Sequence, residues 1–86
     1  MHFVYIIKSK KQKLYIGYTN NLRKRLQEHN QGLVRSTKPY IPWKIVYYEA
    51  YISREEALHR EHNLKLRANA WYQLKRRIKE SIKNAN

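Results

Sequence analysis

Residues 3–18 of the chain have the sequence FVYIIKSKKQKLYIGY, and this stretch decides the fold class. It contains two runs rich in β-branched and aromatic residues, Phe3 to Ile7 and Leu14 to Tyr18, which predict two strands. The polar link between them, Lys8 to Lys13, has the length of a hairpin connection but contains no Gly or Asn, so it predicts no particular turn type. We therefore expect a β-hairpin over this stretch.

A third strand is predicted over the run Trp43 to Tyr51. Alternation places Ile45, Tyr47 and Tyr51 on one face of this strand, with Glu49 as a polar exception. Together with the hairpin, this strand makes a three-stranded, mainly antiparallel sheet packed by helices the most economical architecture.

The first two predicted helices are marked by capping residues. The first begins after Thr19 or Asn20, either of which can cap it, and ends at Gly32, the residue type favoured just past a helix C-terminus. The second opens at Ser53, which has capping-box spacing to Glu56. The first helix therefore leads away from the hairpin, and the second follows the third strand.

A third helix is predicted to start after Asn69, because apolar residues recur there at helical spacing: Trp71, Leu74, Ile78 and Ile82. The predicted order is thus strand, strand, helix, strand, helix, helix, an α+β fold with three helices flanking the sheet. A chain of 86 residues leaves no room for a second core, so we expect a single domain over residues 1–86.

Charge is the most pronounced feature of the composition. The chain has 19 Lys and Arg against 6 Asp and Glu, a formal net charge of +13. This excess predicts a polyanionic partner. Taken alone, it favours a ribosome-associated or architectural protein that coats nucleic acid. A basic membrane-surface peptide is disfavoured, because the cations are spread along the whole chain between strand-like segments.

What the sequence lacks excludes further classes. It has no Cys, which excludes a disulfide framework, a thiolate zinc site and a cysteine nucleophile. The apolar run Phe3 to Ile7 is too short for a signal-peptide core or a membrane span. We therefore expect a soluble cytoplasmic protein with no membrane partner, whose metal, if any, is held by oxygen or imidazole.

Among the acidic residues, all of which are Glu, Glu61 is the strongest candidate for chemistry. It shares the inward face of the second helix with Ala57, Leu58 and Leu64. A carboxylate there needs a cationic partner, since burying it unpaired would cost several kcal/mol. Two interpretations remain open at this point, a metal ligand and a buried salt bridge to one of the many Lys or Arg residues.

Four other side chains are candidates for the same site. Arg25 and His29 lie four residues apart on the first helix and project toward one edge of the core. The Arg fork matches phosphate oxygens, but taken in isolation the pair is better explained by a solvated helix face. Tyr5 and Tyr15 lie at corresponding places on the paired strands, where core packing or stacking is the alternative. A tyrosine becomes a base only near cations or a metal.

In the order of these segments the chain resembles the GIY-YIG nucleases, which include the catalytic part of a bacterial excision-repair nuclease and phage homing endonucleases. The two family tripeptides correspond to Phe3-Val4-Tyr5, which keeps the Tyr, and to an intact Tyr15-Ile16-Gly17. The segment from Tyr18 to His29 resembles the family's loop and first helix, and Thr37 to Trp43 its next loop. The stretch from Glu55 to Lys65 resembles the helix with the metal-binding Glu. The likeness runs to about Arg77 and is greatest for small stand-alone members.

The resemblance implies a metal-dependent endonuclease that cuts DNA, in repair, recombination or mobile elements. Tyr15 would be the general base, with Tyr5 positioning it or the phosphate. Arg25 would hold the scissile phosphate, and His29 would assist in orientation or proton transfer. Glu61 would ligate one Mg²⁺ or Mn²⁺, which acts as a Lewis acid.

The matching segments also contain residues that would contact nucleic acid, namely Gly17, Tyr18, Thr19, Asn20, Lys38 and Lys65. DNA is the expected partner, and the sequence does not distinguish it from RNA. Because no recognition domain is appended, specificity would be low, structure-based or supplied by a protein partner. The alternative is a nucleic-acid-binding module of the same fold without significant catalysis.

Overall fold

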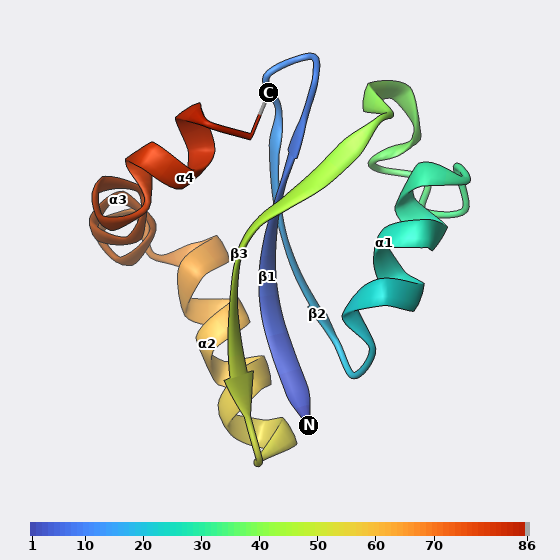
Figure 1. Ribbon diagram of the computed structural model, residues 1–86. Coiled ribbons are helices and arrows are strands. Elements are labelled where there is room, and N and C mark those ends of the chain that lie inside the picture. Colours follow the sequence, from blue (N-terminus) through green and yellow to red (C-terminus); the bar gives the residue numbers. More distant parts are fainter. Residues whose placement is uncertain (86) are drawn as a thin grey trace.

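The computed structural model describes residues 1–85 and has the predicted order of elements, with two short additions (Figure 1). The elements are β1 (His2–Ser9), β2 (Leu14–Thr19), α1 (Leu22–Asn30), the 3-10 helix η1 (Lys38–Tyr40), β3 (Trp43–Tyr51), α2 (Arg54–Leu66), α3 (Ala68–Arg77) and α4 (Lys79–Lys83). Within the described part of the chain, no helix is long and apolar enough to cross a membrane.

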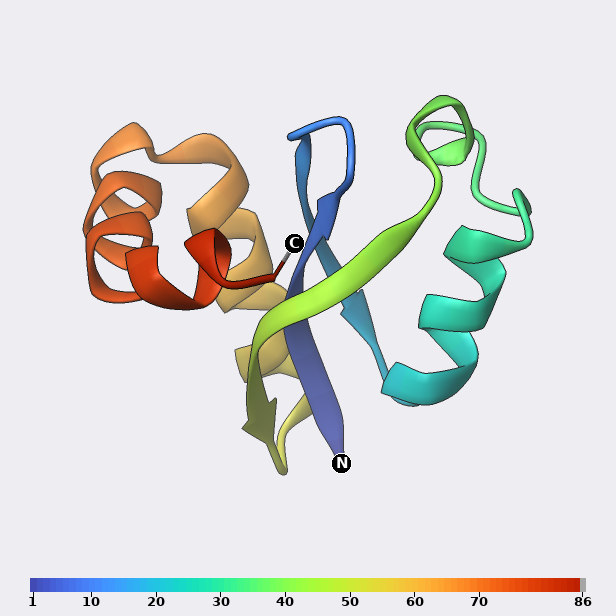
Figure 2. The same cartoon turned by 45° about the horizontal axis from the view of Figure 1, so that its top comes forward.

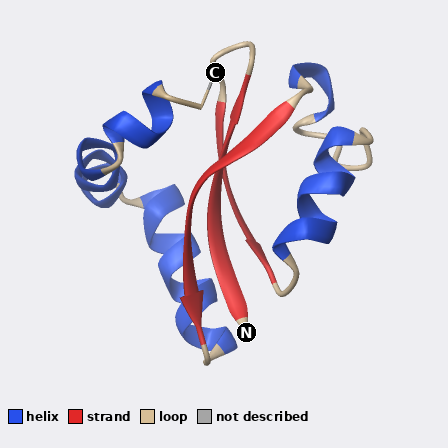
Figure 3. Cartoon of the chain, in the orientation of Figure 1, coloured by secondary structure: helices blue, strands red, loops and turns tan. Residues whose placement is uncertain are grey.

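The three strands form one antiparallel sheet in the order β2-β1-β3. Figures 1 and 2 show α1 on one face of this sheet and α2, α3 and α4 on the other. The layers are clearest in Figure 3, where helices flank the strands on both sides. The predicted α+β fold class is therefore confirmed, and β1 lies at its centre with β2 as a free edge.

Alternation along β1 divides the core between the two faces of the sheet. Val4 and Ile6 pack with residues of α2 and α3, including Leu64 and Leu74. Tyr5 and Ile7 face the other way, toward the predicted apolar stripe of α1, Leu22 and Leu26. Any side chain from α2 that meets Tyr5 must therefore reach around the edge of the sheet.

The predicted face pattern of β3 is wrong for Ile45. The pairing with β1 shifts by one residue, since Ile6 lies opposite Tyr47 whereas Ile7 lies opposite Ile45. This β-bulge inserts one extra residue, which turns the following side chains to the opposite face. As a result Ile45 packs on the α1 side with Ile7, while Tyr47 packs on the α2 side.

Both ends of α1 differ slightly from prediction. Asn21, not Thr19 or Asn20, is the N-cap, and its side chain accepts a hydrogen bond from the Lys24 amide. The helix ends at Asn30, two residues before Gly32. Gly32 has φ +78° and donates to the carbonyl of His29, while the next amide reaches the carbonyl of Glu28. This is a Schellman ending, which needs a left-handed residue just past the helix.

The N-cap of α2 agrees with the prediction, whereas the predicted third helix is not continuous. Ser53 caps α2 as expected, and its hydroxyl accepts from the Glu56 amide. The predicted third helix, however, is divided at Ile78, whose φ of −110° and ψ of 19° leave the helical region. The bend keeps Ile78 and Ile82 on the core, and the carbonyl of Ile82 accepts from the buried ammonium of Lys8.

Candidate active site

Tyr5 lies at the centre of the candidate site because the residue opposite it on β2 is Gly17. A β-carbon at position 17 would overlap the Cζ and Oη atoms of Tyr5. The phenol can therefore cross the neighbouring strand only over a glycine. Gly17, predicted to contact nucleic acid, is buried at this crossing. The third residue of the Tyr-Ile-Gly tripeptide is Gly because any side chain there would overlap Tyr5.

A chain of buried hydrogen bonds holds the Tyr5 hydroxyl. His29 Nε2 lies 2.7 Å from Tyr5 Oη, and its Nδ1 lies 2.7 Å from Thr37 Oγ1. Thr37 donates its one hydroxyl proton to the carbonyl of Val34 at 3.2 Å, so it accepts from His29 Nδ1–H. The remaining ring nitrogen of His29, Nε2, thus carries a lone pair, and the Tyr5 hydroxyl donates to it.

Burial keeps this pair neutral at physiological pH. Tyr5 is 2% exposed and His29 fully buried. Burial raises the pKa of Tyr5 to about 12, against the nearby guanidinium of Arg25. Burial also lowers the pKa of His29 to about 4, assisted by the positive charge of Arg25. Tyr5 therefore keeps its proton, and His29 accepts a hydrogen bond rather than carrying charge.

Thr37→Val tests the role of the hydroxyl in this chain. The substitution leaves His29 Nδ1–H without an acceptor, which should cost about 1–3 kcal/mol and favour the other tautomer, with the proton on Nε2. Imidazole ¹⁵N chemical shifts should show the proton on Nδ1 in the wild-type protein and on Nε2 in Thr37→Val. Thr37→Ser, which keeps the hydroxyl, is the control. A wild-type protein with its proton on Nε2 would contradict the assignment.

Arg25 places its guanidinium, with an unpaired Nε–H, next to Tyr5. Its Nη1 is 3.0 Å from Glu28 Oε1, an ion pair within α1 that the sequence did not suggest. Its Nε–H is buried and has no acceptor at hydrogen-bonding geometry among residues 1–85, although the guanidinium acts as a donor toward the Tyr5 hydroxyl and opposes the rise of its pKa. Buried donors are nearly always satisfied, and a phosphate oxygen is an acceptor that suits this fork.

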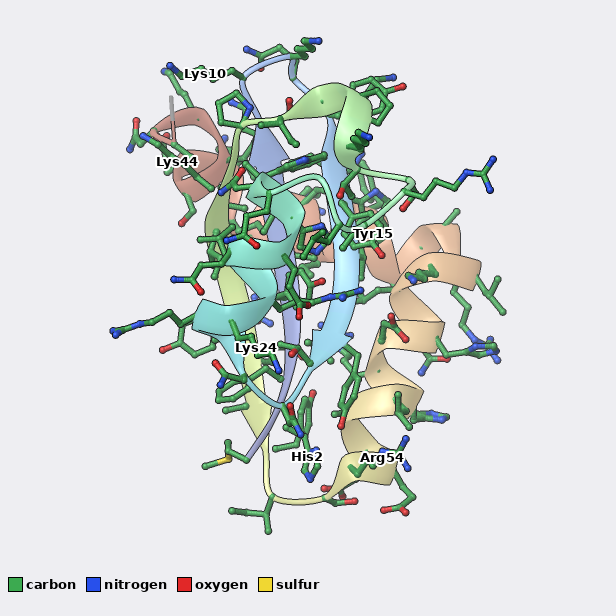
Figure 4. All side chains as sticks on the ribbon, turned by 90° about the vertical axis from the view of Figure 1, so that its right-hand side faces the viewer. His2, Lys10, Tyr15, Lys24, Lys44 and Arg54 are labelled. Atoms are coloured by element: carbon green, nitrogen blue, oxygen red, sulfur yellow. The ribbon has the colours of Figure 1, made fainter. Side chains whose placement is uncertain are left out.

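Arg25 opens onto a cleft of about 320 Å³ at the junction of β2 and α1. Two further cations, Lys24 and Arg54, line the cleft. Figure 4 shows both in the lower half of the view, where α1 and α2 begin. Three residues predicted to contact nucleic acid line it as well, namely Tyr18, Thr19 and Asn20. The Tyr18 hydroxyl also bonds to His2 at 2.7 Å, and Thr19 is buried against the backbone of Asn21. The cleft therefore has three cations against the one carboxylate of Glu28, and Arg25 connects it to Tyr5.

Glu61 and Tyr15 complete the arrangement at the edge of β2. Glu61 Oε2 is 3.1 Å from Lys65 Nζ, which in turn lies 5.6 Å from the centre of the Tyr15 ring. The ion pair is the alternative left open by the sequence, but it is only partly buried, since the Glu61 and Lys65 side chains are 20% and 43% exposed. The negative charge of Glu61 also acts on the pKa of Tyr5. Glu61 thus lies near Tyr15 through Lys65, close enough for its charge to contribute to the raised pKa of Tyr5.

The five predicted catalytic residues lie in one region. The rings of Tyr5, Tyr15 and His29 are 5.1–6.4 Å apart between centres. Arg25 and Glu61 both act electrostatically on Tyr5, from α1 and α2 respectively. Of the remaining predicted contacts, Lys65 belongs to this region, and Lys38 is exposed at the start of η1, next to Thr37.

Three residues with no role predicted from the sequence support the site, namely Thr37, Trp43 and Asn30. Trp43 packs on Tyr15 and His29 and donates from Nε1 to the carbonyl of Thr37 at 2.9 Å. The Asn30 side chain bonds to both the amide and the carbonyl of Trp43. These contacts fix the loop that orients His29. Only the position of Thr37 and Trp43 in a segment of family likeness could have indicated them, and Asn30 lies just outside such a segment.

The donor set fits one hydrated divalent cation better than a closed cage. Over residues 1–85, no group of three or more His, Cys, Asp or Glu could hold a metal ion. Glu49 is committed elsewhere, because it binds Arg60 at 2.9 Å and accepts from Tyr47 and Tyr51. Glu61 offers carboxylate oxygens at a partly exposed edge. Mg²⁺ keeps several waters and is often held by one or two carboxylates plus phosphate oxygens, which Glu61 can satisfy.

Comparisons with known proteins identify the family of the chain. Residues 1–79 match the model of the GIY-YIG catalytic domain. A UPF0213 protein of Clostridium perfringens is 44% identical over 66 residues, which cover 76% of this chain and 71% of that protein. One from Staphylococcus haemolyticus is 43% identical over 65 residues, covering 74% and 79%.

A solved structure gives the same result. The solution NMR structure of the UPF0213 protein BH0048 from Bacillus halodurans has a TM-score of 0.53 and 33% identity, covering 85% of this chain and 80% of that one. The family resemblance expected from the two tripeptides and the segments after them is confirmed. The chain belongs to the GIY-YIG catalytic domain family and is related to its UPF0213 proteins.

Proposed function

We propose that this protein is a metal-dependent endonuclease that hydrolyses phosphodiester bonds in DNA, in a repair or recombination setting. Membership of a nuclease family supports the reaction class. The observation that carries the proposal is Arg25, whose buried Nε–H lacks an acceptor beside the Tyr5–His29 pair. A scissile phosphate at this point would satisfy that donor and lie between Arg25, Tyr15 and Glu61.

In this mechanism each side chain has a separate task. Arg25 leaves Glu28, binds two phosphate oxygens and stabilises the charge that develops on them. Tyr15, which is partly exposed, first releases its phenolic proton to solvent and then, as the phenolate, accepts a proton from the attacking water. Tyr5 is less suited to that step, because its pKa is about 12 and its hydroxyl is held by His29. Tyr5 and His29 instead position the phosphate and Arg25.

Glu61 would hold the divalent cation, Mg²⁺ or Mn²⁺, after releasing Lys65. When bound, the cation supplies Lewis-acid stabilisation of the phosphate and of the leaving oxygen. Lys65, on the next turn of α2, would pair with a neighbouring phosphate of the substrate.

Tyr15→Phe tests this assignment, because it removes only the hydroxyl and keeps the ring contacts with His29 and Trp43. We expect kcat to fall about 10²- to 10⁴-fold, the usual contribution of a general base, with little change in DNA affinity. The assay uses single-stranded, duplex, nicked and branched DNA with and without Mg²⁺. Tyr48→Phe, at an exposed position of β3, is the control. Undiminished cleavage by Tyr15→Phe would contradict the role of Tyr15.

One observation favours a second candidate, a nucleic-acid-binding module of the same fold. Both key charges are already paired within their own helices, Arg25 with Glu28 and Glu61 with Lys65. A protein that never recruits metal would keep these pairs. It would bind DNA with strong salt dependence and cleave none of the four substrates with either Mg²⁺ or Mn²⁺.

A further inference from the structure

A second groove, of about 420 Å³, begins at Tyr15 and continues between β2 and the α2–α3 corner. Figure 4 shows Tyr15 on the side of β2 next to α2. The groove has an apolar floor and a cationic rim that includes Lys13 and Lys65. Its floor is formed by Leu14, Ile16, Leu64 and Trp71. The candidate active site and this groove therefore share Tyr15 and Lys65.

Two aromatic rings in this region carry lysine ammonium groups over their faces. Lys65 Nζ lies 5.6 Å from the centre of Tyr15, and Lys75 Nζ lies 5.4 Å from the centre of Trp71. Flexible lysine side chains can move aside, unlike packed core residues. Trp71 thus offers a π surface to a planar ligand, with cations next to it.

We propose that this groove, which we call the base groove, binds an unpaired nucleotide next to the scissile phosphate. Its base stacks on Trp71, and its phosphates pair with Lys13, Lys65 and Lys75. The inference rests on the proposed function, because it places the scissile phosphate at Arg25 and Tyr15. It adds the substrate class, which is nucleic acid with a single-stranded segment at the cleavage point.

Charge and shape select this occupant. An apolar floor lined by two lysines, Lys13 and Lys65, with Lys75 over the Trp71 ring, suits a ligand that is planar and apolar in one part and anionic in the other, as a nucleotide is. The Lys13 ammonium, which lies 5.3 Å from the centre of the Tyr40 ring, would turn toward the ligand. Aromatic rings beside cations are the usual platform for single strands. In a continuous duplex, neighbouring bases cover each base face, so the duplex can offer only its backbone to the groove. The base groove therefore discriminates between paired and unpaired substrate.

The test compares two DNA probes in EDTA, a fluorescein-labelled single-stranded oligothymidylate and a blunt duplex of the same length, at fixed salt. Trp71→Leu keeps an apolar side chain but removes the π surface. It should weaken binding of the single strand about 5- to 150-fold, the range for one stacked base, and leave duplex binding unchanged. Tyr72→Leu is the matched control, since Tyr72 is the next residue of α3, is 56% exposed and does not line the groove.

Tryptophan fluorescence gives a second readout. Trp43 is only 3% exposed but packs on Tyr15, so the part of the quenching by oligothymidylate that is lost in Trp71→Leu reports Trp71. An abasic strand of the same length should bind more weakly and quench less. Equal losses on both probes, or no loss for Trp71→Leu, would overturn the base groove. Because these measurements need no cleavage, failure of the nuclease assay with selective binding intact would reject the proposed function alone.

Discussion

Glu61→Gln is expected to abolish Mg²⁺-dependent cleavage while leaving DNA binding nearly intact. Gln keeps the shape of the side chain but lacks the negative charge that a hard divalent cation requires from its protein carboxylate. The stability of the metal-free protein should change by less than about 1 kcal/mol. The lost ion pair to Lys65 is partly exposed and lies within one helix, and such pairs contribute little.

The measurements are Mn²⁺ binding by calorimetry, melting temperature with and without Mn²⁺, and cleavage. Glu80→Gln is the control, because Glu80 is exposed in α4, outside the candidate site. A large loss of stability without metal, together with an unaltered metal response, would show that Glu61 is purely structural. Full activity of Glu61→Gln would remove the metal from the mechanism.

Arg25→Ala is expected to reduce cleavage about 10³- to 10⁵-fold, the range for an arginine that stabilises charge in phosphoryl transfer. DNA affinity should fall far less, and the slope of log affinity against log salt should change by about one. The many other cations of a chain with formal charge +13 still bind the backbone. Arg25→Lys should fail as well, because an ammonium cannot reproduce the two-pronged contact.

Arg23→Ala is the matched control for this experiment. Arg23 is an exposed cation two residues earlier in α1, and it does not line the cleft at Arg25. It should lower affinity slightly and leave kcat unchanged. Wild-type cleavage by Arg25→Ala, or a loss explained fully by weaker binding, would contradict its role as a phosphate clamp.

Local sequence patterns predicted the structural features that depend only on residues close together in the chain. The strands followed from β-branched and aromatic runs, and the Ser53 cap from its spacing to Glu56, because both signals act within a few residues. The bulge between Ile45 and Tyr47 was not predictable, since it depends on the match between two strands far apart in sequence. The bend at Ile78 likewise has no local breaker and depends on packing against the sheet.

For the candidate site, residue types and helical spacing indicated Arg25, His29 and Glu61, and the family likeness supplied their proposed roles. What the sequence could not indicate is the partner of each group. Thr37 is eight residues from His29 and lies in an irregular loop, so its bond to Nδ1 depends on the tertiary path. The pairing of Arg25 with Glu28 was equally compatible with a plain solvated helix face.

The passage of Tyr5 over Gly17 makes the active site a sensor of strand register. If β1 slipped by two residues along β2, Tyr5 would face Tyr15 or Thr19, whose side chains occupy the space that the glycine leaves open. A slip by one would turn the phenol to the opposite face of the sheet. A misregistered hairpin would thus be catalytically silent, because Tyr5 could not reach His29. The proposed nuclease activity would therefore report correct assembly, and changes to the hairpin loop could be screened for folding by that activity.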